Sequence, residues 1–318
     1  MLICLMVDNI GWWRQFENVL KEMKLPYRLI MPEVSTWMEE VGKCDAVIWR
    51  FNLQEPYRDE SSDKLHYIEF VLKKNVFPNA HHRWHYNNKL AQAYLAHHYQ
   101  LKMPPTFVSY SYEEVLSYLE TCSYPIVSKS AGGAASRNVR LLENYDQARK
   151  EADVIFRQDR FTVFVDRMLN KFKLMRKLRH QQYGYVSYQK FVAGNSRDYR
   201  VTTIGCDKAF AFHRNNRPND FRASGSGLID YDGNQDFGVI KYCLDISNKL
   251  GFDSMAYDIV YDEKDFYILE FSYTYSDVAI YNAPGYFTCV QGQFQFVPGH
   301  VWPQQLIMEH MLSKWKQS

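Results

Sequence analysis

The chain has 318 residues, and its 46% hydrophobic and 23% charged residues are ordinary for a globular protein. The length allows two or three subdomains, and the net charge of +2 is too small to indicate nucleic acid or an anionic membrane surface as a partner. No uncharged apolar run is long enough to cross a bilayer, and the apolar stretch at the start is too short for a signal peptide.

Strands alternate with helices in the first quarter of the chain. Short apolar runs predict the strands, and apolar residues at helical spacing predict the helices. In chain order the predicted elements cover residues 2–7, 12–23, 27–31, 33–41, 46–51 and 63–74. This alternation is typical of parallel pairing, so we expect a small α/β domain over residues 1–78.

The rest of the chain mixes strands and helices and becomes largely β after about residue 188. Helices are predicted over residues 88–101, 113–120, 237–250 and 303–315, and strands over residues 106–108 and 125–129, with further alternation over 139–190. We expect one subdomain over residues 79–190 and another over residues 191–318.

The six cysteines are scattered, with no pair at a spacing typical of a metal or redox motif. Several lie inside apolar runs, which favours free, buried thiols in a reducing compartment over disulfides or zinc ligands. We therefore expect a cytoplasmic protein with free thiols at Cys4, Cys44, Cys122, Cys206, Cys243 and Cys289.

Two acidic residues, Asp258 and Glu270, lie in the two arms of a predicted hairpin whose turn covers residues 262–265. A tight turn would place both carboxylates on one face of the sheet. Oxygen ligands arranged in this way suit Mg²⁺, which proteins hold with one or two carboxylates while phosphates complete its shell. The alternative is a pair of ordinary polar residues at strand ends.

Lys129 ends a predicted strand and is followed by a loop of small residues that contains Gly132, Gly133 and Ser136. Small residues let backbone N–H groups approach phosphate oxygens closely. The loop is not a Walker motif, because the lysine precedes it and no Gly-Lys-Ser/Thr sequence ends it. A surface turn without function has the same composition.

A third polar region covers residues 188–201, where Asp198 and Arg200 lie two apart and share one face if the segment is a strand. Arg222 follows, just before a turn rich in glycine and serine. Arginine side chains match the geometry of phosphate and carboxylate groups. Arginines opposite a carboxylate-bound metal would therefore form a site for a polyanion.

Taken together, these residues occur in the order found in ATP-grasp enzymes: Lys89 on a helix, Lys129 before the small-residue loop, the segment 189–200, Arg222, and Asp258 with Glu270. Over residues 78 to about 275 the chain resembles the carboxylate–amine ligase branch, which includes ribosomal-protein glutamate ligase and D-alanine–D-alanine ligase. The resemblance implies the ATP-grasp fold, with an α/β N-terminal domain and two α+β subdomains that clamp ATP.

The resemblance also implies a role for each residue. Contacts with ATP are implied for Lys89, Lys129, the lid residues Gly132, Gly133 and Ser136, the hinge residues Gln189, Lys190, Phe191 and Val192 beside adenine, and Asp198 at the ribose. Catalytic roles near the γ-phosphate and the acyl group are implied for Arg200 and Arg222, and Mg²⁺ binding for Asp258, Glu270 and Ser272.

Two of these positions depart from the family pattern. The family usually has asparagine where this chain has Ser272, whose hydroxyl is a weaker metal ligand, and this puts a second metal ion in doubt. The glutamate-ligase branch often has an acid where this chain has Lys190, so the contact with adenine can differ.

The activity implied by the resemblance is that of an ATP- and Mg²⁺-dependent ligase. It would form an amide between a carboxylate and an amine through an acyl phosphate and release ADP and phosphate. Its partners would be small molecules (amino acids, peptides or acidic sugars), and neither nucleic acid nor a membrane is expected as a partner. The protein could form a homodimer. The alternative is an ATP-binding protein of the same fold without ligase turnover. A sugar-nucleotide transferase or dinucleotide binder is disfavoured, because the first strand and turn lack a Gly-x-Gly-x-x-Gly sequence.

Three further features each have two interpretations. His81, His82 and His85 fit polar groups at a domain junction better than a metal site. Five cations within residues 171–179 indicate a solvated helix face, or else a contact for an anionic substrate. The aromatic segment 273–302 either shapes the acceptor pocket or packs the C-terminal unit.

Overall fold

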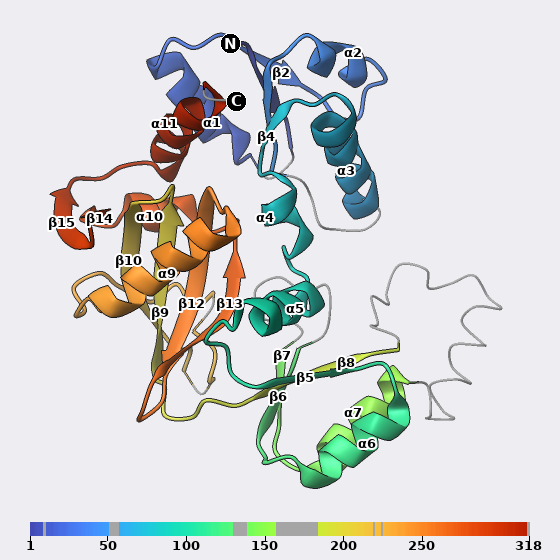
Figure 1. Cartoon of the computed structure of the whole chain (residues 1–318). Helices are drawn as coiled ribbons and strands as arrows, with labels where there is room; N and C mark the ends of the chain where they lie inside the picture. Colours follow the sequence, from blue (N-terminus) through green and yellow to red (C-terminus); the bar gives the residue numbers. More distant parts are fainter. Residues whose placement is uncertain are drawn as a thin grey trace.

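Three separate sheets follow one another along the chain, each with its own helices (Figure 1). The structure is a computed structural model, and it describes residues 1–8, 11–50, 57–129, 139–156, 184–218, 220–223 and 225–316.

The first sheet has four parallel strands in the order β2-β1-β3-β4. Its strands are β1 (Ile3–Met6), β2 (Tyr27–Ile30), β3 (Ala46–Ile48) and β4 (Asn75–Phe77), and the intervening helices are α1 (Trp13–Glu22), α2 (Trp37–Gly42), α3 (Tyr57–His66) and the π-helical turn η1 (Tyr67–Val71). All of β1 is buried, as expected for a parallel strand with helices on both sides of its sheet. The predicted α/β arrangement of this part is confirmed.

Some elements of this region differ from the prediction. The helix predicted over residues 33–41 begins only at Trp37, and the helix predicted from residue 63 begins at Tyr57. A short helix that we did not predict, α4 (Ala80–Trp84), follows β4. The Asn79 side chain accepts hydrogen bonds from the backbone N–H groups of His81 at 3.0 Å and His82 at 3.4 Å. Such a cap stabilises a helix that is too short to show a periodic pattern.

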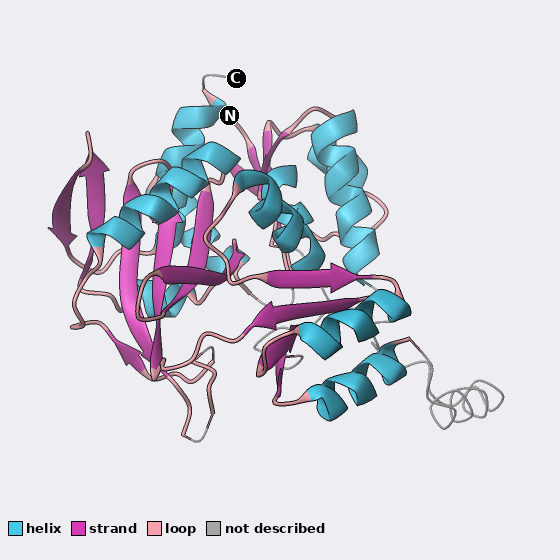
Figure 2. Ribbon diagram, turned by 60° about the horizontal axis from the view of Figure 1, so that its bottom comes forward, coloured by secondary structure: helices cyan, strands magenta, loops and turns pink. Residues whose placement is uncertain are grey.

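The second sheet has four antiparallel strands in the order β5-β8-β6-β7. Its elements are β5 (Thr106–Ser109), α6 (Tyr112–Thr121), β6 (Ile126–Lys129), β7 (Val139–Leu142), α7 (Tyr145–Ile155) and β8 (Val186–Lys190). The two helices lie side by side against the sheet (Figure 2). Val115 and Leu119 from α6, and Ala148 and Ala152 from α7, form a small separate core with the sheet.

The third sheet is antiparallel and follows the path β13-β12-β9-β10-β14-β15, with β11 paired to β10. Its elements are β9 (Arg197–Ile204), β10 (Lys208–Asn215), β11 (Ile229–Asp230), α9 (Phe237–Leu250), β12 (Ser254–Tyr261), β13 (Phe266–Ser272), α10 (Asp277–Tyr281), β14 (Gly285–Val290), β15 (Gln293–Pro298) and α11 (Pro303–Trp315). The bounds of α9 and α11 match the prediction. α9 has clear end signals, because Asp236 caps its first turn and Gly251 ends it with a φ of +69°.

The helix α5 (Lys89–Tyr99) connects the first and second sheets and lies beside β13 (Figure 1). The Asn88 side chain caps it by accepting a hydrogen bond from the N–H of Ala91 at 3.1 Å. Gln92, which is 3% exposed, donates a hydrogen bond to the carbonyl oxygen of Phe271 at 2.8 Å. This contact fixes the start of α5, and therefore Lys89, close to the end of β13.

The helix α11 returns to the first unit and packs on α1 (Figure 1). Phe16 and Leu20 from α1 share a buried cluster with Ile307 and Met311 from α11 and with Phe210 from β10. Segments from the start and the end of the chain therefore build one core.

The cysteines correct one prediction. Cys4 on β1 and Cys44, two residues before β3, form a disulfide with their Cα atoms 5.8 Å apart, so the expectation of six free thiols is wrong for this pair. The separation of 40 residues hid a proximity that only the pairing of β1 with β3 creates. The other four cysteines are free. The disulfide removes part of the basis for the cytoplasmic assignment.

None of the helices that the structure describes has the length and apolar character needed to span a bilayer.

Candidate functional site

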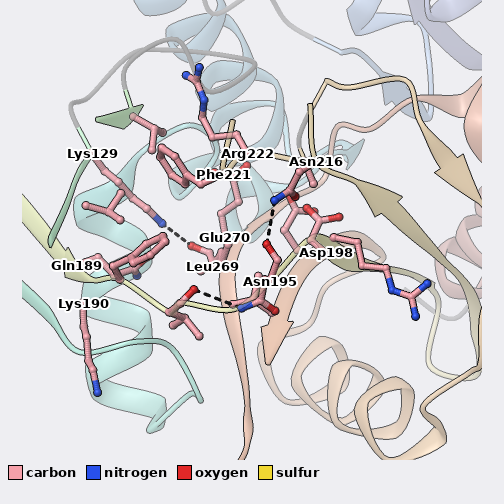
Figure 3. A pocket seen from close by; sticks show the side chains of 18 residues that line it. Lys129, Gln189, Lys190, Asn195, Asp198, Asn216, Phe221, Arg222, Leu269 and Glu270 are labelled. Atoms are coloured by element: carbon pink, nitrogen blue, oxygen red, sulfur yellow. Dashed lines mark hydrogen bonds between the residues drawn. The ribbon is translucent and has the colours of Figure 1, made fainter. Parts of the chain in front are cut away.

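A pocket lies where strand ends of the second sheet face the third sheet (Figure 3). Residues from β6 and β8 form one side, and residues from β9, β12 and β13 form the other. The lining residues are Val127, Lys129, Val139, Gln189, Lys190, Phe191, Val192, Asn195, Arg197, Asp198, Asn216, Phe221, Arg222, Ala223, Asp258, Val260, Leu269 and Glu270. Most of the predicted site residues that the structure describes are among them.

The predicted acidic hairpin is confirmed. β12 and β13 pair in antiparallel fashion, and Asp258 lies directly opposite Glu270. Residues directly opposite each other in such a pair share one face of the sheet. The carboxylate of Asp262 accepts hydrogen bonds from the N–H groups of Lys264 at 2.9 Å and Asp265 at 2.8 Å, which keeps the turn tight. The sequence therefore located both acids and their common face correctly.

Two lysines from different elements meet at this acidic pair. Lys129, the last residue of β6, donates a hydrogen bond from Nζ to the carbonyl oxygen of Leu269 at 2.9 Å (Figure 3). Lys89, the first residue of α5, forms an ion pair with Oε2 of Glu270. Groups that lie far apart in the sequence thus converge on one edge of the pocket.

The charges at this edge shift the pKa values of the groups involved. Burial and the neighbouring Lys89 lower the pKa of Lys129 to about 7, although Glu270 and Asp258 oppose the shift. Lys89 lowers the pKa of Glu270, against the effect of burial. The site therefore holds an ionised carboxylate beside a lysine that titrates near neutral pH.

Asp258 is held by two arginines. Its Oδ1 accepts a hydrogen bond from Nε of Arg200, the residue opposite it on β9. Its Oδ2 lies 2.9 Å from Nη2 of Arg214 on β10. Burial alone would raise the pKa of Asp258, but the two guanidinium groups hold it below its usual value. Each oxygen of Asp258 therefore has a cationic partner.

Arg214 is a residue that the sequence analysis missed. It lies opposite Asp198 in the hairpin of β9 and β10 and binds it with both ends of the guanidinium, with Nε 2.8 Å from Oδ1. With Asp258 as its second partner, it joins three neighbouring strands. The one available signal was its place in an apolar strand, where an arginine needs a buried acid as a partner.

The predicted adenine hinge, residues 189–192, lines the pocket as a group. Gln189 is 2% exposed, and its side-chain amide donates to the Thr106 hydroxyl at 3.1 Å. The Lys190 side chain extends away from Lys129 and Glu270 (Figure 3). Phe191 packs edge-to-face on Phe221, with ring centroids 5.8 Å apart. An apolar wall beside backbone polar groups suits a flat heterocycle.

Other predicted site residues have partners of their own. Asp198 lines the pocket, but both of its oxygens are bound by Arg214. Arg222 lines the pocket and pairs with Asp220 through contacts of 2.6 to 3.0 Å. Arg200 is not among the lining residues. The hydroxyl of Ser272 accepts a hydrogen bond from the N–H of Thr274 at 3.1 Å.

Some predictions lie outside the described residues or outside this pocket. Gly132, Gly133, Ser136 and the basic segment 171–179 are not among the residues that the structure describes. The aromatic segment 273–302 forms α10, β14 and β15, none of its described residues lines this pocket, and several of its rings pack on one another. Phe287 and Phe296, for example, pack on each other across β14 and β15.

The histidine-rich region lies at a junction, as predicted. His82 is fully buried, and its Nε2 accepts a hydrogen bond from the N–H of Asp253 at 2.6 Å. Burial lowers the pKa of His82 to about 4, so its ring is neutral. Within the described part of the chain, no cluster of three His, Cys, Asp or Glu side chains could hold a metal ion.

The donor set at the pocket fits one Mg²⁺ ion better than two. The Glu270 side chain is 36% exposed and pairs with Lys89 through Oε2 alone, so Oε1 is available to a cation. The Asp258 side chain is 6% exposed, and both of its oxygens are paired. Mg²⁺ completes its shell with phosphate oxygens and water, so a single protein carboxylate is enough to hold it.

Two asparagines complete the pocket and were also missed. The Asn195 side chain binds the end of β12, donating to the carbonyl oxygen of Tyr261 at 2.8 Å and accepting from its N–H at 2.9 Å. Asn216 donates to the carbonyl oxygen of Asn195 at 2.9 Å (Figure 3). These bonds hold the loop that follows residues 189–192 against the third sheet. No sequence pattern predicts them.

No protein-family model and no curated protein matches the sequence. Solved structures do resemble the fold. One is a RimK domain ATP-grasp protein from Sphaerobacter thermophilus, with a TM-score of 0.62, 13% identity, and coverage of 98% of this chain and 100% of the other. Another is the ATP-grasp ligase PsnB complexed with a minimal precursor, Mg and ADP, with a TM-score of 0.58, 12% identity, and coverage of 99% and 98%.

A third similar structure is D-alanine–D-alanine ligase from Bacillus anthracis, with a TM-score of 0.60, 11% identity, and coverage of 99% of this chain and 98% of the other. These likenesses extend over nearly the whole of each chain. At such low identities they concern the arrangement of elements, and that arrangement includes the two sheets that enclose the pocket. The chain has the ATP-grasp fold.

Proposed function

We propose that this protein is an ATP- and Mg²⁺-dependent ligase that joins a carboxylate to an amine through an acyl phosphate. The observation that carries the proposal is that Lys129 and Glu270, from two separate elements, line one pocket, and that Lys89 from a third element pairs with Glu270. The fold supports it, because several similar structures are ATP-grasp ligases and one of them holds Mg and ADP.

In this proposal the two lysines bind the nucleotide phosphates. Lys129 reaches the site from the second sheet and Lys89 reaches it from α5, so a phosphate between them is neutralised from two sides. The loop with Gly132, Gly133 and Ser136 would close over the same phosphates with its backbone N–H groups.

The adenosine part would lie along the hinge. Gln189, Phe191 and Val192 would contact adenine, and Lys190 would contribute through its backbone, because its side chain extends away from the pocket (Figure 3). Asp198 would meet the ribose with the lone pairs that Arg214 leaves, since a carboxylate has about four acceptor sites.

Mg²⁺ bound at Glu270 would neutralise charge on the phosphate oxygens while the phosphoryl group is transferred. Asp258 and Ser272 are the weaker candidates for its ligands, since both have partners within the protein.

The reaction follows from the weak electrophilicity of a carboxylate. A carboxylate oxygen attacks the γ-phosphorus of ATP, the bond to the bridging oxygen breaks, and ADP leaves. The amine then attacks the acyl carbon, the bond from that carbon to the phosphate oxygen breaks, and the amine loses a proton. The products are an amide, ADP and phosphate. The residues position the reactants, and Arg200 and Arg222 would neutralise charge on the transferred group.

Release of ADP in the presence of paired carboxylates and amines tests this function. Lys129→Met and Glu270→Gln should each lower the rate about 100-fold or more, because the first removes a cation that binds the phosphates and the second removes the negative charge that binds Mg²⁺. Lys208→Met is the matched control and should keep the full rate. Lys208 is the first residue of β10 and lies at the other end of this strand from Arg214. Undiminished ADP release in both site variants would contradict the assignment.

The substrate panel should include amino acids, peptides and acidic sugars. The names of the similar proteins support the first two classes, since one structure holds a minimal precursor and another enzyme joins D-alanine to D-alanine. All three substrate classes are therefore tested together.

The second candidate function is ATP binding without ligase turnover. It is favoured by Ser272 in place of asparagine and by the complete pairing of Asp258, which together weaken the metal site. Tight binding of ATP with no ADP formed over the whole panel would support this candidate against the first.

A further inference from the structure

We infer that this site takes one divalent cation per nucleotide, bound by Glu270, and that Asp258 is a positioning residue for Arg200 and Arg214. The inference rests on the proposed function and narrows it. It states which of the two neighbouring carboxylates, Asp258 or Glu270, binds the metal ion and which function the other one has.

The two carboxylates lie opposite each other but differ in what surrounds them. Asp258 binds Arg200 through Oδ1 and Arg214 through Oδ2, and its side chain is 6% exposed. Glu270 uses only Oε2, for Lys89, and its side chain is 36% exposed. A cation arriving with a nucleotide can reach a free oxygen on Glu270 without breaking an ion pair.

The pairing of Asp258 is part of a closed set of buried charges. Arg214 is 10% exposed and binds Asp198 as well as Asp258, while Arg200 binds Asp258. Two acids and two arginines on neighbouring strands neutralise one another. If Asp258 turned to a metal ion, a buried guanidinium would lose its partner, which is strongly unfavourable.

Ser272 does not supply the missing ligand. Its hydroxyl lies 3.1 Å from both the N–H and the hydroxyl of Thr274, so it stabilises the end of β13. Among the described residues at this site, neither Asp258 nor Ser272 therefore has an oxygen without a partner for a second metal ion. Glu270 would already bind the first.

The ion pair with Arg200 also indicates the function of Asp258. It holds Arg200 through Nε, and within the described part of the chain the two terminal Nη groups of Arg200 make no hydrogen bond. Those groups form the outer edge of the guanidinium, which suits an anion. Asp258 therefore fixes the orientation of Arg200, whose side chain is 14% exposed and lies behind the residues that line the pocket.

Counting bound metal tests the inference directly. The full-length protein is saturated with the non-hydrolysable analogue AMPPNP, Mn²⁺ is added, and free Mn²⁺ is measured by electron paramagnetic resonance. We expect one Mn²⁺ per bound nucleotide. Two per nucleotide would overturn the inference and leave the ligase proposal standing. A failure to bind AMPPNP, measured by equilibrium dialysis of the same sample, would overturn both.

Two variants separate the roles of the acids. Glu270→Gln should weaken Mn²⁺ binding to the complex at least about tenfold, whereas Asp258→Asn should change it less than about threefold. Asp258→Asn should instead weaken AMPPNP itself, because Arg200 loses its anchor. Equal loss of Mn²⁺ binding in both variants would refute the assignment. If Asp258→Asn does not fold, Arg214→Lys replaces it, with the same expected result for Mn²⁺.

Discussion

Lys129 is a side chain whose acid–base chemistry its surroundings alter strongly. Its ammonium group lies beside another cation, Lys89, and is largely withdrawn from water, so its pKa falls to about 7. The nearby carboxylates limit the fall without cancelling it. In the protein without nucleotide, a large share of Lys129 is therefore uncharged at pH 8.

Nucleotide binding should consequently take up a proton. The phosphates favour the charged form of Lys129 and raise its pKa, so at pH 8 up to about one proton enters with each nucleotide, and the affinity falls as the pH rises above about 7. Calorimetric titrations with AMPPNP in two buffers of different ionisation enthalpy measure this uptake.

The matched variant is Lys129→Arg. It keeps a charge at all these pH values, because a guanidinium does not titrate there, so the proton uptake should vanish. If the wild-type protein binds AMPPNP at pH 8 without proton uptake, the altered pKa of Lys129 is refuted.

Among the elements, the start of β12 is the point where α4 and α11 are joined. Asp253 is 2% exposed and accepts hydrogen bonds from Lys314 at 2.7 Å and His310 at 3.0 Å on α11. It also accepts one from Asn79, the cap of α4, at 3.2 Å. Burial opposes the ionised form, but His310, His82 and Lys314 lower the pKa of Asp253 to about 2.

Asp253→Ala should therefore lower the free energy of unfolding by about 3 kcal/mol, because it removes one side of a buried charged cluster. The contribution of Asp253 should be complete above about pH 4, where the unfolded carboxyl is ionised, and be lost as the pH falls toward 2. Urea unfolding at pH 7 and at lower pH measures both effects.

Asp207→Ala is the control, since the Asp207 side chain is 44% exposed and, among the residues that the structure describes, its carboxylate pairs with its neighbour Lys208 alone. It should change the unfolding free energy by no more than about 0.5 kcal/mol. Equal effects of the two substitutions on the free energy of unfolding would show that the contacts of Asp253 do not stabilise this junction.

Individual elements also show what sequence periodicity can predict. The helices α9 and α11 were predicted with correct bounds because their apolar residues repeat over several turns. The short helix α4 escaped because five residues carry no period, and only its cap at Asn79 gave a local signal. The hairpin with Asp258 and Glu270 was predictable because a polar turn separates two apolar runs.

At the scale of the whole molecule, the pocket joins two sheets that have separate cores. Its residues could be anticipated from their order in the chain, but their partners could not. Arg214 and the Cys4–Cys44 disulfide depend on which strands lie side by side, and the single sequence does not determine that order. The same holds for the difference between Asp258 and Glu270, which look equivalent in the sequence.

A nucleotide between the two sheets should stabilise both of them. With AMPPNP and Mg²⁺ at 100 times the dissociation constant, the stabilisation is about 2.7 kcal/mol, and amide exchange should slow in β6 and β8 as well as in β12 and β13. Hydrogen–deuterium exchange followed by mass spectrometry measures this, with Lys129→Met as the variant that loses the effect. Protection confined to one sheet would place the nucleotide elsewhere.

The contact of α11 with α1 has a consequence for biosynthesis. The helix α1 leaves the ribosome before α11, so Phe16 and Leu20 stay without part of their cover until Ile307 and Met311 have been translated. Domains generally fold in order as they emerge, so α1 lacks its contact with α11 while the chain between these two helices is translated. The longer the chain between two helices that share a core, the longer the first of them waits for its partner during translation.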